Sequence, residues 1–201
     1  MSLSLHGRAA GEQTWSITPE KHAWLVRVQT DFGGVLPNLR RVQTARLHPR
    51  TLASLSYQET DSARGKVFEA SFDRKTGLAT VKLGRDEASV PMTEEFHDPV
   101  SMLLWLRTVR PERAELRLTG GRVHVGRLAD TEVDGVPTLH YTLRPGNASV
   151  YIEAKEPYRI LRLIQPTDFG PLDATLREQQ RPKRENKPPE RDQGGQRRRR
   201  R

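Results

Sequence analysis

Apolar and polar residues alternate with a period of two along most of the chain between Trp24 and Leu176. Runs such as "KVFEASFD", "AELRLTG", "TLHYTLR" and "YRILRLIQ" place every second side chain on one face of an extended strand. Turn residues separate the runs at short intervals, as in "DRKTG" at 73–77, Asp134-Gly135 and "RPGNA" at 144–148. Short links join antiparallel neighbours, because parallel strands need a long crossover. The pattern predicts a mainly β fold, a curved antiparallel meander of about nine to eleven strands.

One segment, "HDPVSMLLWLRTV" at 97–109, breaks the alternation. Asp98 suits a helix N-cap and Pro99 suits the first helical turn. The residues that follow are too densely apolar for a half-exposed strand, so we expect a helix of about ten residues, buried on most of its faces. A large antiparallel sheet with a single apolar helix is expected to curl around that helix as a half-barrel.

The last 25 residues differ in composition from the rest of the chain. Residues 177–201, "REQQRPKRENKPPERDQGGQRRRRR", contain no apolar side chain other than proline, so they cannot offset the entropy cost of ordering. We therefore expect a half-barrel domain at 1–176 and a disordered C-terminal tail at 177–201. The tail holds 11 Lys or Arg and 4 Asp or Glu, which is +7 of the formal net charge of +9. The domain is nearly neutral, so an argument from net charge to nucleic acid applies to the tail alone.

The chain contains no cysteine, which excludes disulfides, thiolate catalysis and Cys-ligated zinc. The first fifteen residues, "MSLSLHGRAAGEQTW", hold no apolar run long enough for a signal peptide, and no stretch is long enough for a transmembrane helix. From the sequence as written we expect a cytoplasmic protein, or a periplasmic one if a leader precedes this start.

The tetrapeptide Thr-Asp-Phe-Gly occurs twice, at 30–33 and at 167–170. Asp-Phe-Gly is the magnesium-binding tripeptide of protein kinases, but the chain has no glycine-rich phosphate loop and no His-Arg-Asp catalytic motif to accompany it. Each copy lies between two apolar runs, so we interpret both as strand-turn-strand connections.

Candidate catalytic and metal-binding residues are few. The six histidines show no metal-ligand spacing such as H-x-H, and His97-Asp98 with the preceding Glu94-Glu95 is the densest titratable cluster. Helix capping accounts for Asp98 better than acid/base chemistry does, and nucleophile-elbow motifs are absent from the sequence. We expect no enzymatic activity, no metal and no cofactor.

Two groups of residues are candidates for binding. Met102, Trp105 and Leu106 could line an apolar concavity that holds an acyl chain, and simple core packing is the alternative. Arg197, Arg198, Arg199, Arg200 and Arg201 form a guanidinium cluster that suits phosphate groups of nucleic acid or another polyanion, and an inert solubilising tail is the alternative. A membrane surface fits less well, because no aromatic residue accompanies the charge.

The stretch "DPVSMLLWLR" and the strands of 120–176 resemble the bacterial family of unknown function numbered 3108, which has an Asp-x-x-Ser helix followed by strand pairs with a "dG" turn. The resemblance implies an open half-barrel similar to the lipoprotein carriers of the Gram-negative periplasm, with the helix in an apolar concavity, and it implies no catalytic residues. The arginine tail is not a feature of that family. We therefore expect a non-enzymatic binding or scaffold protein with a polyanion-binding tail, and the alternative is an envelope lipid or lipoprotein carrier with an inert tail.

Overall fold

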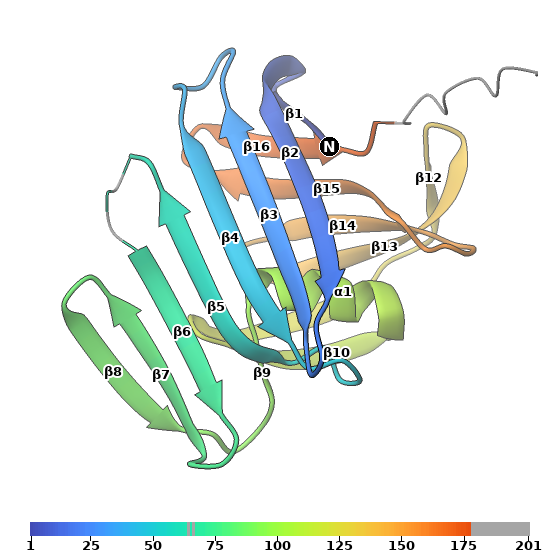
Figure 1. Ribbon diagram of the computed structural model, residues 1–201. Helices are drawn as coiled ribbons and strands as arrows, with labels where there is room; N and C mark the ends of the chain where they lie inside the picture. Colours follow the sequence, from blue (N-terminus) through green and yellow to red (C-terminus); the bar gives the residue numbers. More distant parts are fainter. Residues whose placement is uncertain (64, 66, 178–201) are drawn as a thin grey trace, which may run out of the picture.

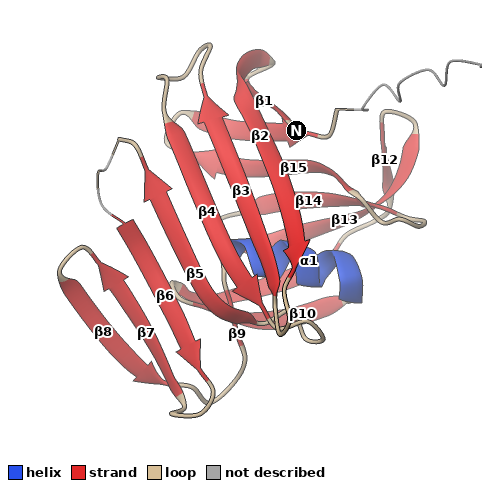
Figure 2. Cartoon of the chain, in the orientation of Figure 1, coloured by secondary structure: helices blue, strands red, loops and turns tan. Residues whose placement is uncertain are grey.

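The chain forms one strongly curved, open β-sheet with a single helix, as the computed structural model shows for residues 1–63, 65 and 67–177 (Figures 1 and 2). The mainly β fold with one helix confirms the prediction, and Arg197–Arg201, like most of the segment 177–201, lie outside the described residues. The elements are β1 (Ser2–Leu5), β2 (Arg8–Pro19), β3 (Trp24–Phe32), β4 (Arg40–Leu47), β5 (Ser54–Asp61), β6 (Val67–Asp73), β7 (Leu78–Leu83), β8 (Asp86–Pro91), β9 (Phe96–His97), α1 (Pro99–Val109), β10 (Arg113–Leu118), β11 (Gly121–Arg127), β12 (Thr131–Val133), β13 (Val136–Arg144), β14 (Ala148–Glu153), β15 (Ile160–Thr167) and β16 (Gly170–Thr175).

The sheet consists of two meanders that meet where the N-terminal and C-terminal strands pair. The strand order runs from β8 back to β1, then from β16 back through β15, β14, β13, β11 and β10 to β9. Ser2 pairs with Thr175 and Leu5 with Leu172 along the antiparallel β1–β16 seam. The open edges of the sheet therefore belong to the middle of the sequence, at β8 and β9. In Figure 1 the strands β2 to β8 form the front layer, and β13 to β16 cross behind them.

The sheet has 16 strands, more than the nine to eleven predicted. The count was wrong because β1 alternates over only four residues and β2 has weak apolar alternation: most side chains of Arg8–Pro19 are exposed or half-buried. The two-residue β9 and the three-residue β12 are too short to produce a period-two signal. One pairing is also not antiparallel, because β9 lies parallel to β10 and α1 provides the crossover between them.

The predicted turns are confirmed. Residues 73–77 connect β6 to β7, and the segment "RPGNA" connects β13 to β14. Asp134 and Gly135 form the two-residue link between β12 and β13, where Val133 pairs with Val136. Both have positive φ, 51° and 76°, which is the type I′ geometry that favours glycine at the second position.

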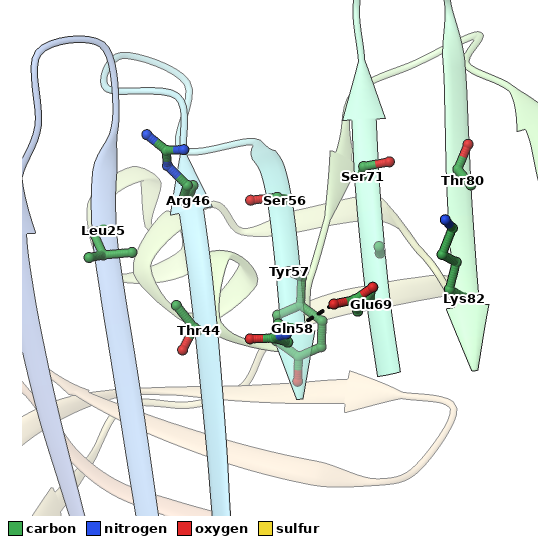
Figure 3. A pocket seen from close by; sticks show the side chains of 11 residues that line it. Leu25, Thr44, Arg46, Ser56, Tyr57, Gln58, Glu69, Ser71, Thr80 and Lys82 are labelled. Atoms are coloured by element: carbon green, nitrogen blue, oxygen red, sulfur yellow. Dashed lines mark hydrogen bonds between the residues drawn. The ribbon is translucent and has the colours of Figure 1, made fainter. Parts of the chain in front are cut away.

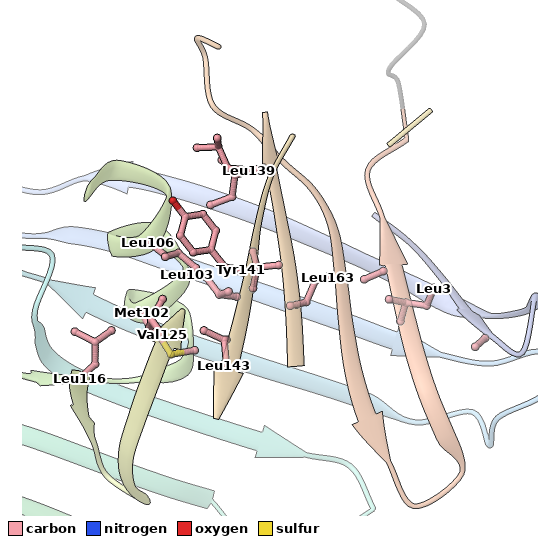
Figure 4. Close-up of a cluster of buried hydrophobic side chains, with 14 of the residues drawn as sticks. Leu3, Met102, Leu103, Leu106, Leu116, Val125, Leu139, Tyr141, Leu143 and Leu163 are labelled. Carbon is pink, nitrogen blue, oxygen red and sulfur yellow. The ribbon is translucent and has the colours of Figure 1, made fainter. Parts of the chain in front are cut away.

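Helix α1 lies between the two layers and contributes to the hydrophobic core on both sides. Val100 and Leu104, one turn apart, pack into the cluster of the N-terminal meander together with Tyr57 and Phe72. Met102, Leu103 and Leu106 pack into the cluster of the C-terminal meander, which Figure 4 shows with Leu116, Val125, Leu139, Tyr141, Leu143 and Leu163. The prediction of a helix buried on most faces is confirmed for these five residues, whereas Trp105 is only half-buried.

A buried polar network fixes the N-terminus of α1 to β5. The Asp98 side chain accepts hydrogen bonds from the backbone N–H groups of Val100 (2.8 Å) and Ser101 (2.9 Å), as the predicted N-cap should. Its second carboxylate oxygen accepts a 2.6 Å hydrogen bond from the hydroxyl of Ser54, the first residue of β5. The backbone N–H of Asp98 donates to the Ser54 and Ser101 hydroxyls, at 2.7 and 2.9 Å. Asp98 is 0% exposed, so water cannot replace its carboxylate. Its removal would leave the donors that bond to the carboxylate, on Val100, Ser101 and Ser54, without an acceptor.

His97 extends the network. Its Nδ1 lies 3.2 Å from the Ser101 hydroxyl, and its ring meets the edge of Trp105 with the centroids 5.9 Å apart. The residue is 3% exposed, and burial lowers the pKa of His97 to about 4, against a smaller opposing effect of the Glu95 charge. The imidazole is therefore neutral in the folded protein at neutral pH.

We predict that Asp98→Ala lowers the free energy of unfolding by about 2–4 kcal/mol, because it removes the cap and leaves three buried donors unsatisfied. Urea denaturation at pH 7 measures the change. Asp86→Ala, at an exposed position of the edge strand β8, is the matched control and should cost less than about 0.5 kcal/mol. Equal losses in the two variants would contradict a structural role of the network.

We predict that stability falls as the pH is lowered from about 6.5 to 4, because the unfolded chain binds a proton at His97 in this range and the folded protein does not. Near pH 4 the difference in proton binding at His97 lowers the free energy of unfolding by about 3 kcal/mol. His97→Asn, which cannot titrate there, should show a correspondingly flatter decline in urea denaturation at pH 7, 6, 5 and 4. Burial raises the pKa of Asp98, so protonation of Asp98 favours the folded state as the pH falls. This opposing effect is present in both the parent and the His97→Asn variant, and it cancels in their comparison. Identical pH profiles would refute the assignment.

Candidate functional site

A cavity of about 490 Å³ lies between the two layers of the sheet, next to the N-terminal half of α1. Strands β2 to β5 form one wall, and β1, β13, β15 and β16 form the other. Its apolar lining residues are Leu3, Trp15, Phe32, Leu36, Pro37, Leu39, Pro99, Val100, Met102, Leu103, Leu143, Leu163, Phe169, Leu172 and Ala174, and its polar ones are Gln13, Thr30, Arg41, Gln43, Glu59, Asp61, Gln165, Thr167 and Asp168.

The strand alternation explains why the deep part of the cavity is apolar. Inward positions of the central strands carry side chains such as Leu3, Leu143 and Leu163, each at most 5% exposed, while their neighbours in sequence point outward. Met102 and Leu103 close the bottom from the helix. The interior is therefore only partly filled by side chains, and a space of ligand size remains.

Charged groups gather on β4 and β5 at one side of the cavity. The guanidinium of Arg41 lies 3.6 Å from the Glu59 carboxylate and 3.5 Å from that of Asp61, and it sits over the ring of Phe32, 5.6 Å from its centroid. Glu59 also accepts a 2.6 Å hydrogen bond from the Tyr57 hydroxyl. Burial, then this hydrogen bond, raises the pKa of Tyr57 well above its ordinary value, so the hydroxyl stays a donor. Asp168, from the β15–β16 hairpin, also lines the cavity, so the whole lining has three carboxylates and one guanidinium.

Both Thr-Asp-Phe-Gly segments reach the rim of this cavity. Asp168 and Phe169 are the turn residues of the β15–β16 hairpin, which confirms the turn interpretation there, and Phe169 is 65% exposed. In the first copy the strand β3 continues to Phe32, and the turn follows at 33–39. Sequence reasoning did not foresee that the two copies would lie at one rim, because the β1–β16 seam that brings them together has no local signal.

The loop at 33–39 covers part of the cavity through Leu36, Pro37 and Leu39. It is held against β2 by hydrogen bonds from the N–H groups of Gly33 and Val35 to the carbonyls of Ala10 and Ala9, both 3.1 Å. Gly34 has φ +64°, and a Cβ there would lie 2.2 Å from the Ala9 carbonyl oxygen. The chain can therefore turn this closely over β2 only with glycine at that position.

Asp31 of the first copy lies at the end of β3 and is not among the lining residues of the cavity. It accepts hydrogen bonds from the Gln29 amide (2.8 Å) and from the guanidinium of Arg40 (2.6 Å), its partner across β3 and β4. These hydrogen bonds lower the pKa of Asp31. The arrangement explains the residue without magnesium or phosphate chemistry.

A second, smaller cavity of about 370 Å³ adjoins the first. The two have four lining residues in common, Gln13 and Trp15 on β2, Leu103 on α1 and Leu163 on β15. The Trp15 indole N–H donates to the Gln13 side chain (2.8 Å), which in turn donates to Thr30 (3.1 Å), so the tryptophan is fixed between the cavities. The outer end of the smaller cavity is lined by Arg107, near the end of α1, and by Arg159, which precedes β15.

The structure places the three sequence-predicted residues of the concavity differently. Met102 lines the larger cavity. Leu106 is fully buried in the C-terminal core cluster, and Trp105 packs against His97; neither lines the larger or the smaller cavity. Sequence reasoning missed Leu103, the helix residue common to both cavities, although the density of apolar residues in the helix includes it.

A third depression lies on the outer face of β3 to β7 and is shallow and largely polar (Figure 3). Ser56, Ser71 and Thr80 stand on neighbouring strands there, beside the 3.0 Å hydrogen bond from Gln58 to Glu69. Few apolar side chains converge on this depression, so it is a weaker candidate than the interior cavity.

The titratable cluster at His97-Asp98 belongs to the buried cap of α1. Ser101 lies within hydrogen-bonding distance of both His97 and Asp98, but all three residues are at most 3% exposed and belong to the network of the helix cap. No three His, Asp or Glu side chains gather at a spacing suited to a metal within the described ranges. Among those residues, no helix is long and apolar enough to span a bilayer.

Comparisons with known proteins agree with this architecture. The crystal structure of the beta-barrel-like protein of domain of unknown function DUF1849 from Brucella abortus is similar, with a TM-score of 0.55 and 9% sequence identity. The similarity covers 88% of this chain and 93% of that one, and at this identity it shows the fold alone. No curated protein sequence matches the chain. The family model described as "Protein of unknown function (DUF3108)" matches residues 1–177, so the chain belongs to the DUF3108 family, as the resemblance of its helix and C-terminal strands predicted.

Proposed function

We propose that the protein is a non-enzymatic binding protein that holds an apolar or amphipathic small molecule between its two β-layers. The observation that carries this proposal is the interior cavity of about 490 Å³, with an apolar bottom and a polar side. Ligand sites in proteins are typically concave, mostly apolar and supplied with a few polar groups that fix orientation.

The packing of α1 indicates that the interior cavity persists in the folded protein. Its two apolar faces are already committed to the two core clusters, and its first turn is tied to β5 through Ser54 and Asp98. The helix therefore cannot move into the cavity without breaking a buried hydrogen-bond network. The side chains that line an apolar cavity lack dispersion contacts on the cavity side. A bound apolar molecule would supply these contacts, and the helix cannot supply them by moving.

An envelope lipid or lipoprotein carrier is the alternative, and the same cavity would serve it. The two proposals differ in the cellular compartment and in the size of the cargo. Fractionation of the native organism into cytoplasm, periplasm and membranes separates them: recovery in the cytoplasmic fraction favours the binding protein, and recovery in the periplasm favours the carrier.

We predict that the neutral apolar dye N-phenyl-1-naphthylamine binds saturably, with increased fluorescence, and that Met102→Trp weakens its binding at least about tenfold by filling the cavity. Met92→Trp is the matched control, because Met92 is half-buried and lines neither interior cavity. The control should bind within about twofold of the parent. Equal weakening in both variants, or no saturable binding to the parent, would contradict the proposed site.

We propose further that the segment 177–201 binds polyanions, on the basis of its 11 basic and 4 acidic residues. Arginine forks pair with phosphate oxygens in bidentate geometry, and such contacts carry little base specificity. This proposal concerns Arg197–Arg201, outside the described residues, and is independent of the cavity.

For duplex DNA we predict a slope of log affinity against log salt concentration of about −4 to −5, from about five phosphate contacts. A fluorescence titration with labelled oligonucleotides at several salt concentrations measures it. Deletion of 178–201, which keeps the Arg177–Glu12 ion pair, should abolish binding and leave thermal stability almost unchanged. A truncated protein that binds DNA as well as the full chain would disprove the role of the tail.

A further inference from the structure

The two interior cavities differ in the charge at their outer ends. At the larger cavity Arg41 pairs with the carboxylates of Glu59 and Asp61, and Asp168 is a third lining carboxylate, so its charged lining carries a net negative charge. Arg107 and Arg159 line the end of the smaller cavity, and no Asp or Glu is among its lining residues. An elongated ligand that spans the shared wall at Trp15 and Leu103 would therefore meet opposite charges at its two ends.

Arg107 supplies the positive charge at the smaller cavity. Its Nε donates to the Tyr158 carbonyl (3.0 Å) and its Nη2 to the Pro157 carbonyl (3.1 Å), and both acceptors are neutral. Arg159, in contrast, donates to the buried carboxylate of Glu153 (2.9 Å), and this ion pair holds the pKa of Glu153 below its usual range. The net charge of Arg107, Arg159 and Glu153 is therefore +1, next to the apolar lining of the smaller cavity.

We propose that the smaller cavity receives the anionic head group of an amphipathic ligand, a carboxylate or a phosphate on an alkyl chain, with the chain lying along Trp15 toward the larger cavity. This inference rests on the proposed function of the cavity and adds the chemical class and orientation of the ligand. The Arg107 guanidinium pairs with the head group, because a half-buried arginine without a hydrogen-bonded carboxylate interacts strongly with an incoming anion. A cationic head group is disfavoured at this end and would have to enter from the acidic side.

The test is displacement of N-phenyl-1-naphthylamine from the full-length protein by four probes of equal chain length below their micellar concentrations: dodecanoate, dodecyl phosphate, dodecyltrimethylammonium and dodecanol. We expect at least one of the two anions to bind about tenfold more tightly than the ammonium probe, and their ranking distinguishes a carboxylate from a phosphate ligand. Acetate and inorganic phosphate, which lack the chain, should not displace the dye.

Arg107→Gln should weaken binding of the preferred anion about tenfold and leave dodecanol within about twofold. Arg110→Gln is the matched control. Arg110 lies near the same helix end and stacks on Tyr158 of the same loop, with its guanidinium 3.8 Å from the ring centroid, but it lines neither cavity. The C-terminal arginines are present in all variants, so their effect cancels in the comparison.

Three outcomes would overturn the inference: tighter binding of the ammonium probe, equal binding of all charged probes, or an equal loss in Arg107→Gln and Arg110→Gln. If dodecanol binds while any of these is found, the head-group assignment fails and the apolar cavity stands. If neither the dye nor dodecanol binds, the proposed function itself fails.

Discussion

The architecture depends on one helix that is buried between the halves of a single curved sheet. Val100 and Leu104 pack on the N-terminal meander, and Met102, Leu103 and Leu106 pack on the C-terminal one. The Asp98 cap, bound to Ser54 of β5, sets the position of the helix along its axis. Because the helix is tied at its N-terminus and apolar on both faces, it holds the two layers apart at a distance that leaves the interior cavity.

The fold was predictable where the signal is local. Alternation, the Asp134-Gly135 turn and the Asp98-Pro99 helix start are all encoded within a few residues, and the structure agrees with each. The pairing of β1 with β16 was not predictable in this way, because Ser2 and Thr175 lie at opposite ends of the domain, whereas strands that follow each other in the sequence are joined by short links. The polar strand β2 was missed for a different reason: its outward face is long and hydrophilic, so Trp15 is one of few inward apolar side chains on it.

The candidate site could be predicted only in part. Of the predicted helix residues, Met102 lines the cavity. Trp105 is half-buried and does not line it, so a high density of apolar residues in the helix does not identify which of its faces borders the cavity. Arg41, Glu59 and Asp61 form one charged group through cross-strand pairing of β4 and β5. Arg107 reaches the loop before Arg159 through contacts about fifty residues apart. Such groupings depend on register and on long-range packing, which a single sequence does not display.

Whether a guest molecule occupies the space beside the helix can be tested with the methionines of the chain, of which there are three. With ¹³C-methyl methionine, a titration with a neutral alkyl ligand such as dodecanol can be followed by the NMR signals of Met92 and Met102. We expect a saturable shift of the signal of Met102, which lines the larger cavity, and an unchanged signal for Met92, which packs against the other core cluster. A shift of Met92 equal to that of Met102, or no shift of Met102 at saturating ligand, would contradict this expectation.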